Sequence, residues 1–480
     1  MKYQRPQLFI GGKWQDSTGR STITVISPTT EEPVGTATDT TSEDLDRAVR
    51  AAREALADAT WAALSPDERA ALLDRFADSL EERAQQTGSV VTDENGMPSS
   101  LSVVAEGAGP AATLRYYANL IRRTPTESER VSADGRSTTI VRREPVGVVA
   151  AIIPWNFPQS LTMFKLAPAL AAGCTVVIKP APETVLDAFQ LADAAEEAGL
   201  PPGVLNIVTG GRETGAELVA HPGVDKVAFT GSTAAGRAIG EVCGRLLRPV
   251  TLELGGKSAA IILDDADLTK VARGLSWASL LNNGQTCYLS SRIFAPRTRY
   301  REVVEAVADL AGSMPVGDPT DPATRVGPLV SRAQRDRVES YIATGIREGA
   351  TVAAGGTRPS HLDRGWFVEP TVFADLDNDA TVSREEIFGP VLAVIPYDAV
   401  DDAVTMANDS DYGLGGTVWT TDPDRGLDLA RRVQTGSIGV NFFNLDIGAP
   451  FGGVKSSGLG RELGPEGLDA YIALKSIYTL

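Results

Sequence analysis

The chain has little cysteine or histidine: three cysteines and two histidines in 480 residues. Cys174, Cys243 and Cys287 are too few and too widely spaced for a disulfide framework, so we expect a reducing compartment, the cytoplasm. With two histidines and no Cys-x-x-Cys pair, we expect no structural zinc and no other metal site.

Long apolar runs are also scarce. Residues 145–164 are free of charge over about the length of a membrane span. Pro154, Asn156 and Pro158 would break a helix there and bury polar groups in lipid, so we predict a buried strand followed by a turn. The first residues, MKYQRPQLFIGGKW, lack the apolar core of a signal peptide, and no leader is expected.

Positive charge is in deficit, with 45 basic against 62 acidic side chains, a net charge of −17 and a pI near 4.7. Such a chain is repelled by phosphate backbones and anionic lipid, so neither nucleic-acid nor membrane partners are expected. The 42% hydrophobic content, 22% charged content and mean hydropathy of −0.07 are typical of globular proteins. The length predicts two or three domains.

The residue pattern predicts an α/β chain. Ser42 opens one early helix, and Ser65 opens a second through a capping box with proline at its first position. From residue 145, short β-branched runs alternate with helical patterns, which indicates βαβ units and a parallel sheet. The expected strands are 146–153, 175–178, 204–208, 224–229, 251–254 and 259–263; the expected helices are 160–172, 188–198, 215–220, 233 onward and 272–281.

Three glycine-containing segments resemble phosphate-binding turns in composition. Residues 229–237 follow an expected strand and open a helix, an arrangement that presents backbone N–H groups to an anion such as a dinucleotide pyrophosphate. Residues 210–215 are similar, and in both places a plain turn is the alternative. No strand is expected before residues 458–464, so a turn is predicted there.

Two side chains are candidates for covalent chemistry. Cys287 follows the polar, glycine-containing segment 282–286, where a thiol can be reached and lie near backbone donors; an inert thiol is the alternative. Cys174 and Cys243 are expected to be structural. Glu253 lies between leucines in an expected strand, where burial would raise its pKa toward the range of a general base. A strand glutamate that faces solvent is the alternative.

A third candidate is Asn156, which lies between two prolines at the carboxyl end of a buried strand. Ligands of open α/β sheets collect at that edge, and a rigid amide can donate to a developing oxyanion. A proline-flanked turn that uses asparagine as a turn former is the alternative. His221 and His361 are expected at the surface, so a Cys–His protease is disfavoured.

The chain resembles the NAD(P)-dependent aldehyde dehydrogenase superfamily in seven ordered motifs, which span nearly all of it: PWNFP (154–158), KPAPET (179–184), FTGSTAAGR (229–237), LELGGK (252–257), GQTC (284–287), EEIFGPV (385–391) and PFGGVKSSGLGRE (450–462). The resemblance implies an α/β fold with a Rossmann-like NAD(P)-binding domain (1–122 and 144–254) and an α/β catalytic domain (255–456). A small β flap (123–143 and 457–480) would pair subunits into homodimers or homotetramers.

The same resemblance implies oxidation of an aldehyde to the free carboxylic acid through a cysteine thiohemiacetal and thioester. Cys287 matches the nucleophile, Glu253 the general base and Asn156 the oxyanion donor, which the backbone N–H of Cys287 assists. Two alternatives stay open. A CoA- or phosphate-dependent acylating reductase has no use for Glu253, and a cofactor-independent cysteine hydrolase needs no nicotinamide.

The resemblance also implies the ligand-binding residues. The cofactor-binding positions are Ile153, Pro154, Trp155, Lys179, Pro182, Glu183, Gly211, Gly215, Phe229, Thr230, Gly231, Ser232, Leu254, Gly255, Glu386 and Phe388. Members that prefer NAD often carry a glutamate at the position of Pro182, so the argument against NADP is weakened here; NAD is favoured, with NADP as the alternative.

The expected wall of the aldehyde tunnel is uncharged: Phe157, Phe164, Leu281, Tyr288, Leu445 and Phe451. An unpaired carboxylate in such a tunnel would be costly, so apolar aliphatic or aromatic aldehydes are the predicted substrates.

Overall fold

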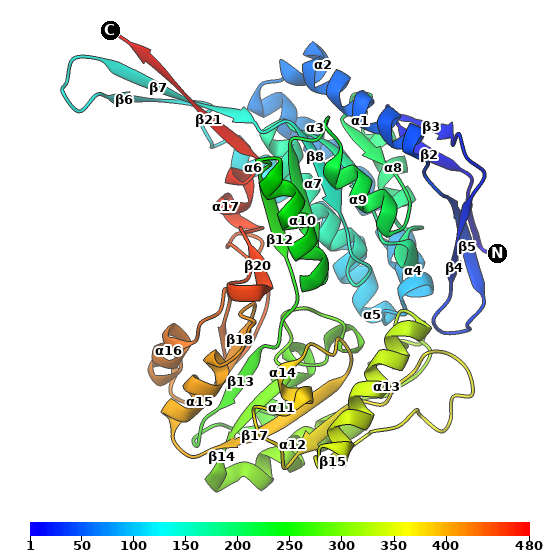
Figure 1. Cartoon of the computed structure of the whole chain (residues 1–480), viewed down its shortest axis with the longest axis vertical. Helices are drawn as coiled ribbons and strands as arrows, with labels where there is room; N and C mark the ends of the chain where they lie inside the picture. Colours follow the sequence, from blue (N-terminus) through cyan, green and yellow to red (C-terminus); the bar gives the residue numbers. More distant parts are fainter.

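The computed structural model describes residues 1–480, which form two large, mainly parallel sheets and two small sheets (Figure 1). The first large sheet has eight strands, and its five central strands run parallel. In spatial order the strands are β20 (Gly458–Leu459), β12 (Val250–Glu253), β11 (Lys226–Thr230), β8 (Val148–Ile152), β9 (Thr175–Lys179), β10 (Leu205–Ile207), β2 (Gln7–Ile10) and β3 (Lys13–Asp16).

Helices cover both faces of this sheet because its parallel strands are apolar on both sides. Along β8, Val148 and Ala150 point into one core, and Val149 and Ala151 into the other. The helices on the first face are α1 (Ser42–Ala57), α9 (Arg212–Ala220) and α10 (Thr233–Arg245). Those on the second are α3 (Pro66–Glu82), α6 (Gly109–Ile121), α7 (Pro158–Ala172) and α8 (Ala188–Glu197).

Short helices connect these elements: α2 (Ala59–Ala62), α4 (Ala84–Asn95), α5 (Ser99–Ser102), the 3-10 turn η2 (Pro182–Thr184) and α17 (Gly464–Asp469). A π-helical turn, η1 (Val103–Ala108), joins α5 to α6. Such turns are rare and often occur at functional sites.

The second large sheet has seven strands and packs helices on its faces in the same way. Its order is β15 (Thr351–Ala354), β16 (Thr371–Ala374), β17 (Val391–Tyr397), β14 (Arg292–Pro296), β13 (Ala259–Ile262), β18 (Gly416–Trp419) and β19 (Gly439–Val440). Its helices and short turns are α11 (Leu268–Ala278), η3 (Leu281–Gly284), η4 (Arg297–Arg299), α12 (Tyr300–Ser313), α13 (Arg332–Arg347), α14 (Thr381–Arg384), α15 (Val400–Asn408), α16 (Pro423–Arg432) and η5 (Lys455–Ser457).

The small sheets lie at the periphery. One combines β1 (Tyr3–Arg5), β5 (Pro33–Thr38) and β4 (Thr22–Ile26). The other combines β21 (Ile472–Thr479), β7 (Thr138–Pro145) and β6 (Glu127–Val131), and it projects from the body of the molecule (Figure 1). β7 pairs antiparallel with both neighbours, so the chain terminus is joined to residues more than three hundred positions away.

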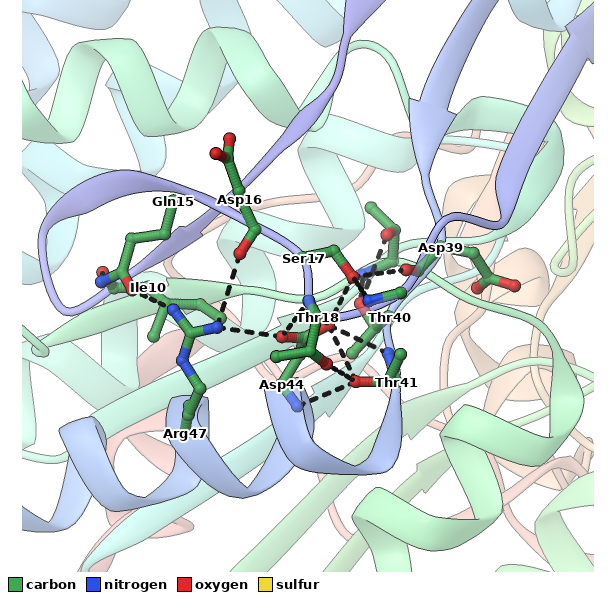
Figure 2. Close-up of polar contacts among 12 residues, drawn as sticks. Ile10, Gln15, Asp16, Ser17, Thr18, Asp39, Thr40, Thr41, Asp44 and Arg47 are labelled. Carbon is green, nitrogen blue, oxygen red and sulfur yellow. Dashed lines mark hydrogen bonds and ion pairs between the residues drawn. The ribbon is translucent and has the colours of Figure 1, made fainter.

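The start of α1 shows how local sequence fixes an element (Figure 2). Thr41 and Asp44 form a reciprocal capping box, and Asp44 also accepts from Ser17 Oγ at 2.5 Å and Thr18 N at 3.1 Å. Burial alone would raise the pKa of Asp44, but the hydrogen bonds from Ser17, Thr18 and Thr41 outweigh it and lower the pKa. This side chain thus ties the helix to the β3 hairpin.

Most expected elements are present, with ends that differ by a few residues: α7 begins at Pro158 rather than Ser160, and α11 ends at Ala278 rather than Leu281. The prediction of a plain turn at residues 458–464 is wrong, because Gly458 and Leu459 pair antiparallel with β12. No helix combines the length and the apolarity that a membrane crossing requires.

Candidate active site

The strand order of the first sheet indicates where a ligand can bind. From β8 the chain builds β9 and β10 on one side and then returns to build β11 and β12 on the other. Loops diverge at the carboxyl ends of strands flanking such a reversal, and ligands bind in the crevice between them. A cavity of about 330 Å³ lies there. Its lining includes Pro154, Trp155, Asn156, Thr230, Gly231, Ser232, Leu254, Gly255, Cys287, Gln334, Arg337, Glu386 and Phe388.

A second cavity, of about 290 Å³, is mostly apolar and has no charged lining residue. It shares Asn156 and Cys287 with the first, so these two side chains lie where the cavities meet. All the residues predicted to line the tunnel are present: Phe157, Phe164, Leu281, Tyr288, Leu445 and Phe451. Their contact with a substrate stays a prediction.

Cys287 is presented by an unusual turn. Asn282, Asn283 and Gly284 all have left-handed backbones, with φ of 49°, 59° and 74°. The Asn283 amide donates to the carbonyl oxygens of Gly96 and Pro328 at 3.1 and 3.0 Å and accepts from Gly327 N at 2.7 Å. The rigid turn therefore fixes the position of the half-buried thiol between the two cavities.

The thiol lies among carboxylates. Burial, then the charges of Glu253 and Glu386, raise the pKa of Cys287 far above its ordinary value. Glu253 is 2% exposed, and neither of its carboxylate oxygens has a hydrogen-bond partner. Burial, then Glu462, raises the pKa of Glu253, whereas Lys165 and Arg461 oppose that rise. The alternative of a solvent-facing strand glutamate is excluded.

Asn156 is buried, and its backbone is held from both sides. Asn282 Nδ2 donates to Asn156 O at 2.8 Å, and Asn95 Nδ2 donates to Trp155 O at 2.7 Å. Asn156 Nδ2 donates one hydrogen bond to Gln285 O at 2.9 Å, which orients the amide. An amide nitrogen carries two hydrogens, so a second one is left for a ligand oxygen.

On the other side of the thiol, Glu386 Oε1 accepts from Gly256 N at 2.9 Å, and burial raises its pKa to about 7. A Cβ at Gly255 would lie 2.3 Å from this carboxylate, so a larger residue there would displace the Glu386 side chain. Phe388 adopts φ of 63° and packs edge-on against Trp155, with ring centroids 5.3 Å apart.

Most of the remaining predicted cofactor residues do not line the first cavity and lie near the carboxyl ends of the strands of the first sheet. Lys179 ends β9, its Nζ donates to Pro180 O and Gly210 O, and burial lowers its pKa to about 8. The others occupy strand ends and helix starts: Pro182 and Glu183 in η2, Gly211 as the N-cap of α9, Gly215 beside the Lys179 side chain, Ser232 as the N-cap of α10, and the buried Ile153 and Phe229.

Sequence reasoning missed several lining residues. Gln334 and Arg337 on α13 bind the carbonyl oxygens of Phe388 and Glu386 at 2.7 and 2.6 Å. Phe443 stacks on Tyr288 at 4.7 Å, and Trp277 joins the apolar cavity from α11. A helix packed on the second sheet gives no local signal that one of its faces lines a cavity at the edge of the first sheet. The aromatic pair NFF at 441–443 could have been noticed.

Comparison with known proteins decides the family. The aldehyde dehydrogenase family profile matches residues 14–477. The chain belongs to the aldehyde dehydrogenase family. It is 56% identical to a protein named geranial dehydrogenase of Castellaniella defragrans, over the whole of both chains, and 41% identical to a phenylacetaldehyde dehydrogenase of Pseudomonas fluorescens, over 98% of this chain and 95% of that one.

Solved structures of this family have the same fold. An aldehyde dehydrogenase of Mycobacterium tuberculosis, solved as a complex with NAD+, superposes with a TM-score of 0.97 at 46% identity over 99% of this chain and 98% of that one. The predicted aldehyde dehydrogenase family, α/β fold and enzyme class are thereby confirmed.

Proposed function

We propose that the enzyme oxidises an apolar aldehyde to the free carboxylic acid, with NAD+ as the hydride acceptor and Cys287 as the nucleophile. The observation that carries this proposal is the position of Cys287, where a polar cavity at the sheet's switch point meets an apolar cavity without charge. A hydride transfer from an aldehyde adduct to a cofactor requires that the substrate site and the cofactor site meet at the reacting group.

The residues at the carboxyl edge of the first sheet fit a dinucleotide. Lys179 Nζ is held by carbonyl oxygens alone and has a hydrogen left to donate to a ribose hydroxyl. The N-terminus of α10, opened by Ser232, favours a pyrophosphate, and the Glu386 carboxylate can accept from a second ribose. Bound NAD+ would accept the hydride that leaves the substrate carbon.

In this proposal each catalytic group acts at a stated atom. Cys287 Sγ loses its proton to solvent and bonds, as thiolate, to the carbonyl carbon, and the carbonyl oxygen receives hydrogen bonds from Asn156 Nδ2 and Cys287 N. Glu253 takes a proton from the water that attacks the resulting thioester, which releases the carboxylic acid and returns the thiolate. The two unpartnered oxygens of Glu253 suit a base that must accept a proton from water.

The apolar cavity favours a hydrophobic substrate. A carboxylate-bearing semialdehyde would have no cation to pair with in this wall. The relatives named for geranial and phenylacetaldehyde support this class, because both aldehydes are uncharged and largely hydrocarbon. We therefore propose medium-length aliphatic, terpenoid or aromatic aldehydes.

We propose a homo-oligomer that works in the cytoplasm. The three cysteines are free, and the proposed nucleophile must stay reduced, which favours a reducing compartment. The projecting sheet of β6, β7 and β21 has two edge strands and exposed apolar side chains, which favours pairing with another subunit. The domain boundaries given above remain part of the proposal.

The test follows NADH absorbance with the purified enzyme. Cys287→Ala should lower turnover by about 10³-fold or more, because no other group can form the thioester. Cys243→Ala, a structural cysteine on α10, should keep most of the activity. Across alkanals, geranial, phenylacetaldehyde and succinic semialdehyde, kcat/KM should be lowest for the semialdehyde. Substantial NADH production by folded Cys287→Ala protein would refute the proposal.

A further inference from the structure

Helix α7 starts immediately after the proposed oxyanion donor, yet its own N-cap residue contributes no capping side chain. Phe157 occupies the N-cap, and Pro158 has no N–H. The first free N–H groups, those of Gln159 and Ser160, both point at Glu106 Oε2, at 2.7 and 3.4 Å. A carboxyl group from a distant segment therefore caps this helix.

Glu106 belongs to the π-helical turn η1 and is fully buried. Ser160 Oγ donates to Ala105 O at 2.8 Å, which adds a second bond between η1 and the start of α7. Residues of both segments line the apolar cavity: Leu101, Val104 and Ala105 from α5 and η1, and Phe157, Leu161 and Phe164 from the start of α7.

The consequence for Asn156 follows from its position. Asn156 lies two residues before the first turn of α7, and its amide must hold a fixed direction to reach the oxygen of a bound aldehyde. Asn95 fixes the carbonyl group that precedes Asn156, and Asn282 fixes the carbonyl group of Asn156 itself. Glu106 fixes the start of α7, the next element along the chain.

We propose that Glu106 is a positioning residue for the reaction, acting through the N-terminus of α7 to hold Asn156 at the oxyanion position. The inference rests on the proposed role of Asn156. Burial raises the pKa of Glu106 to about 8, so its carboxyl is mostly protonated at neutral pH. A glutamine has nearly the same shape and keeps the accepting oxygen.

The chain offers a control in Asp44, on α1. This carboxyl is also fully buried, and it accepts from Thr18 N and Thr41 N, at 3.1 and 3.2 Å, at the start of α1. Asp44 thus makes the same kind of contact at the start of a helix that carries no residue of either cavity. Removal of either carboxyl should cost stability.

The experiment measures the rate of the pre-steady-state NADH burst, which reports formation of the thioester. Glu106→Ala should slow the burst by about tenfold or more, since small displacements of a positioned group carry large rate costs. Glu106→Gln should stay within about twofold of the parent because it keeps the acceptor. Alkylation of Cys287 by iodoacetamide, which needs no oxyanion, should proceed at the parent rate in both variants.

A double-mutant cycle separates positioning from general loosening. In an Asn156→Ala background, Glu106→Ala should add little further loss, because its effect passes through the missing amide. Asp44→Ala should have a smaller effect on the burst, and that effect should multiply with the effect of Asn156→Ala. If Glu106→Ala does not fold, Glu106→Asp, which withdraws the carboxyl by one methylene, replaces it in the same cycle.

The outcomes distinguish the two levels of the proposal. A burst unchanged in Glu106→Ala, or a loss that multiplies with that of Asn156→Ala, overturns the positioning role and leaves the proposed function intact. A burst unchanged in Asn156→Ala itself overturns the oxyanion role and the inference with it. A tenfold loss that glutamine rescues and that vanishes in the Asn156→Ala background supports the inference.

Discussion

At the residue scale, the geometry of Glu253 separates two chemical steps. Its carboxylate is buried beside the thiol, and its oxygens have no partner, so its proposed work is to take a proton from water after the thioester has formed. Glu253→Gln should therefore give one burst of NADH per site and then stall, because an amide cannot accept that proton. Rapid mixing with a saturating aldehyde measures both phases. Steady turnover at the parent rate would contradict the role.

The pKa of the same group predicts a pH profile. Burial, then Glu462, raises the pKa of Glu253, so the ionised base becomes abundant only at higher pH, and kcat should rise with pH until the group is ionised. Glu462→Gln removes a negative charge, which lowers the pKa of Glu253. The acidic limb of the kcat profile should then move to lower pH. A limb that stays in place or moves to higher pH would contradict this assignment.

At the element scale, the left-handed turn of η3 sets the position of the nucleophile. Gly284 has φ of 74°, and a Cβ there would lie 2.2 Å from the Gly389 backbone. Gly284→Ala should destabilise the protein by about 2 kcal/mol or more and should lower the burst rate by displacing Cys287.

The control for this turn is Gly312→Ala. Gly312 lies near the end of α12 with open space around its Cα, and alanine is the better helix former, so stability should stay the same or rise by about 0.5 kcal/mol. Denaturant unfolding and the NADH burst measure the two effects. Equal stability and equal burst rates in the two variants would show that the turn is not constrained.

Elements such as β8, β9, β11 and α7 were predictable because their signals are local: a β-branched run, a glycine turn, a helical apolar pattern. The strand β20, which pairs only with a partner distant in the sequence, was harder to predict. β20 is two residues long and exists because β12 offers an edge, which no periodicity in 458–464 reveals.

The same reasoning explains what the sequence showed of the site. Cys287, Glu253 and Asn156 could be predicted because the residue type of each is unusual for its local sequence. Each of them also lies in one of the ordered motifs. Glu106 carries no such signal, because its partner Gln159 lies 53 residues away and a glutamate in a helical pattern is normally predicted to face solvent. Its burial follows from the packing of η1 against α7.

At the scale of the whole molecule, the projecting sheet of β6, β7 and β21 exposes apolar side chains and two unpaired strand edges. Val131, Leu474 and Tyr478 on its strands are 75%, 66% and 78% exposed, and both outer strands offer unpaired backbone groups. Exposed edges with apolar side chains are normally covered in a stable protein. We propose that a second copy of the chain packs against this sheet and buries these side chains.

Leu474→Glu should therefore weaken subunit association by about 100-fold or more, because a buried charge without a partner is costly at an interface. Light scattering at micromolar concentration should give the 50.6 kDa mass of one chain for this variant and a multiple of it for the parent. Ile346→Glu, at a half-exposed position on α13 away from the sheet, should keep the parent mass. The burst rate should be similar in both variants, since β21 carries no residue of either cavity. A parent enzyme of 50.6 kDa, or a Leu474→Glu variant that keeps the parent's larger mass, would show that this sheet does not join subunits.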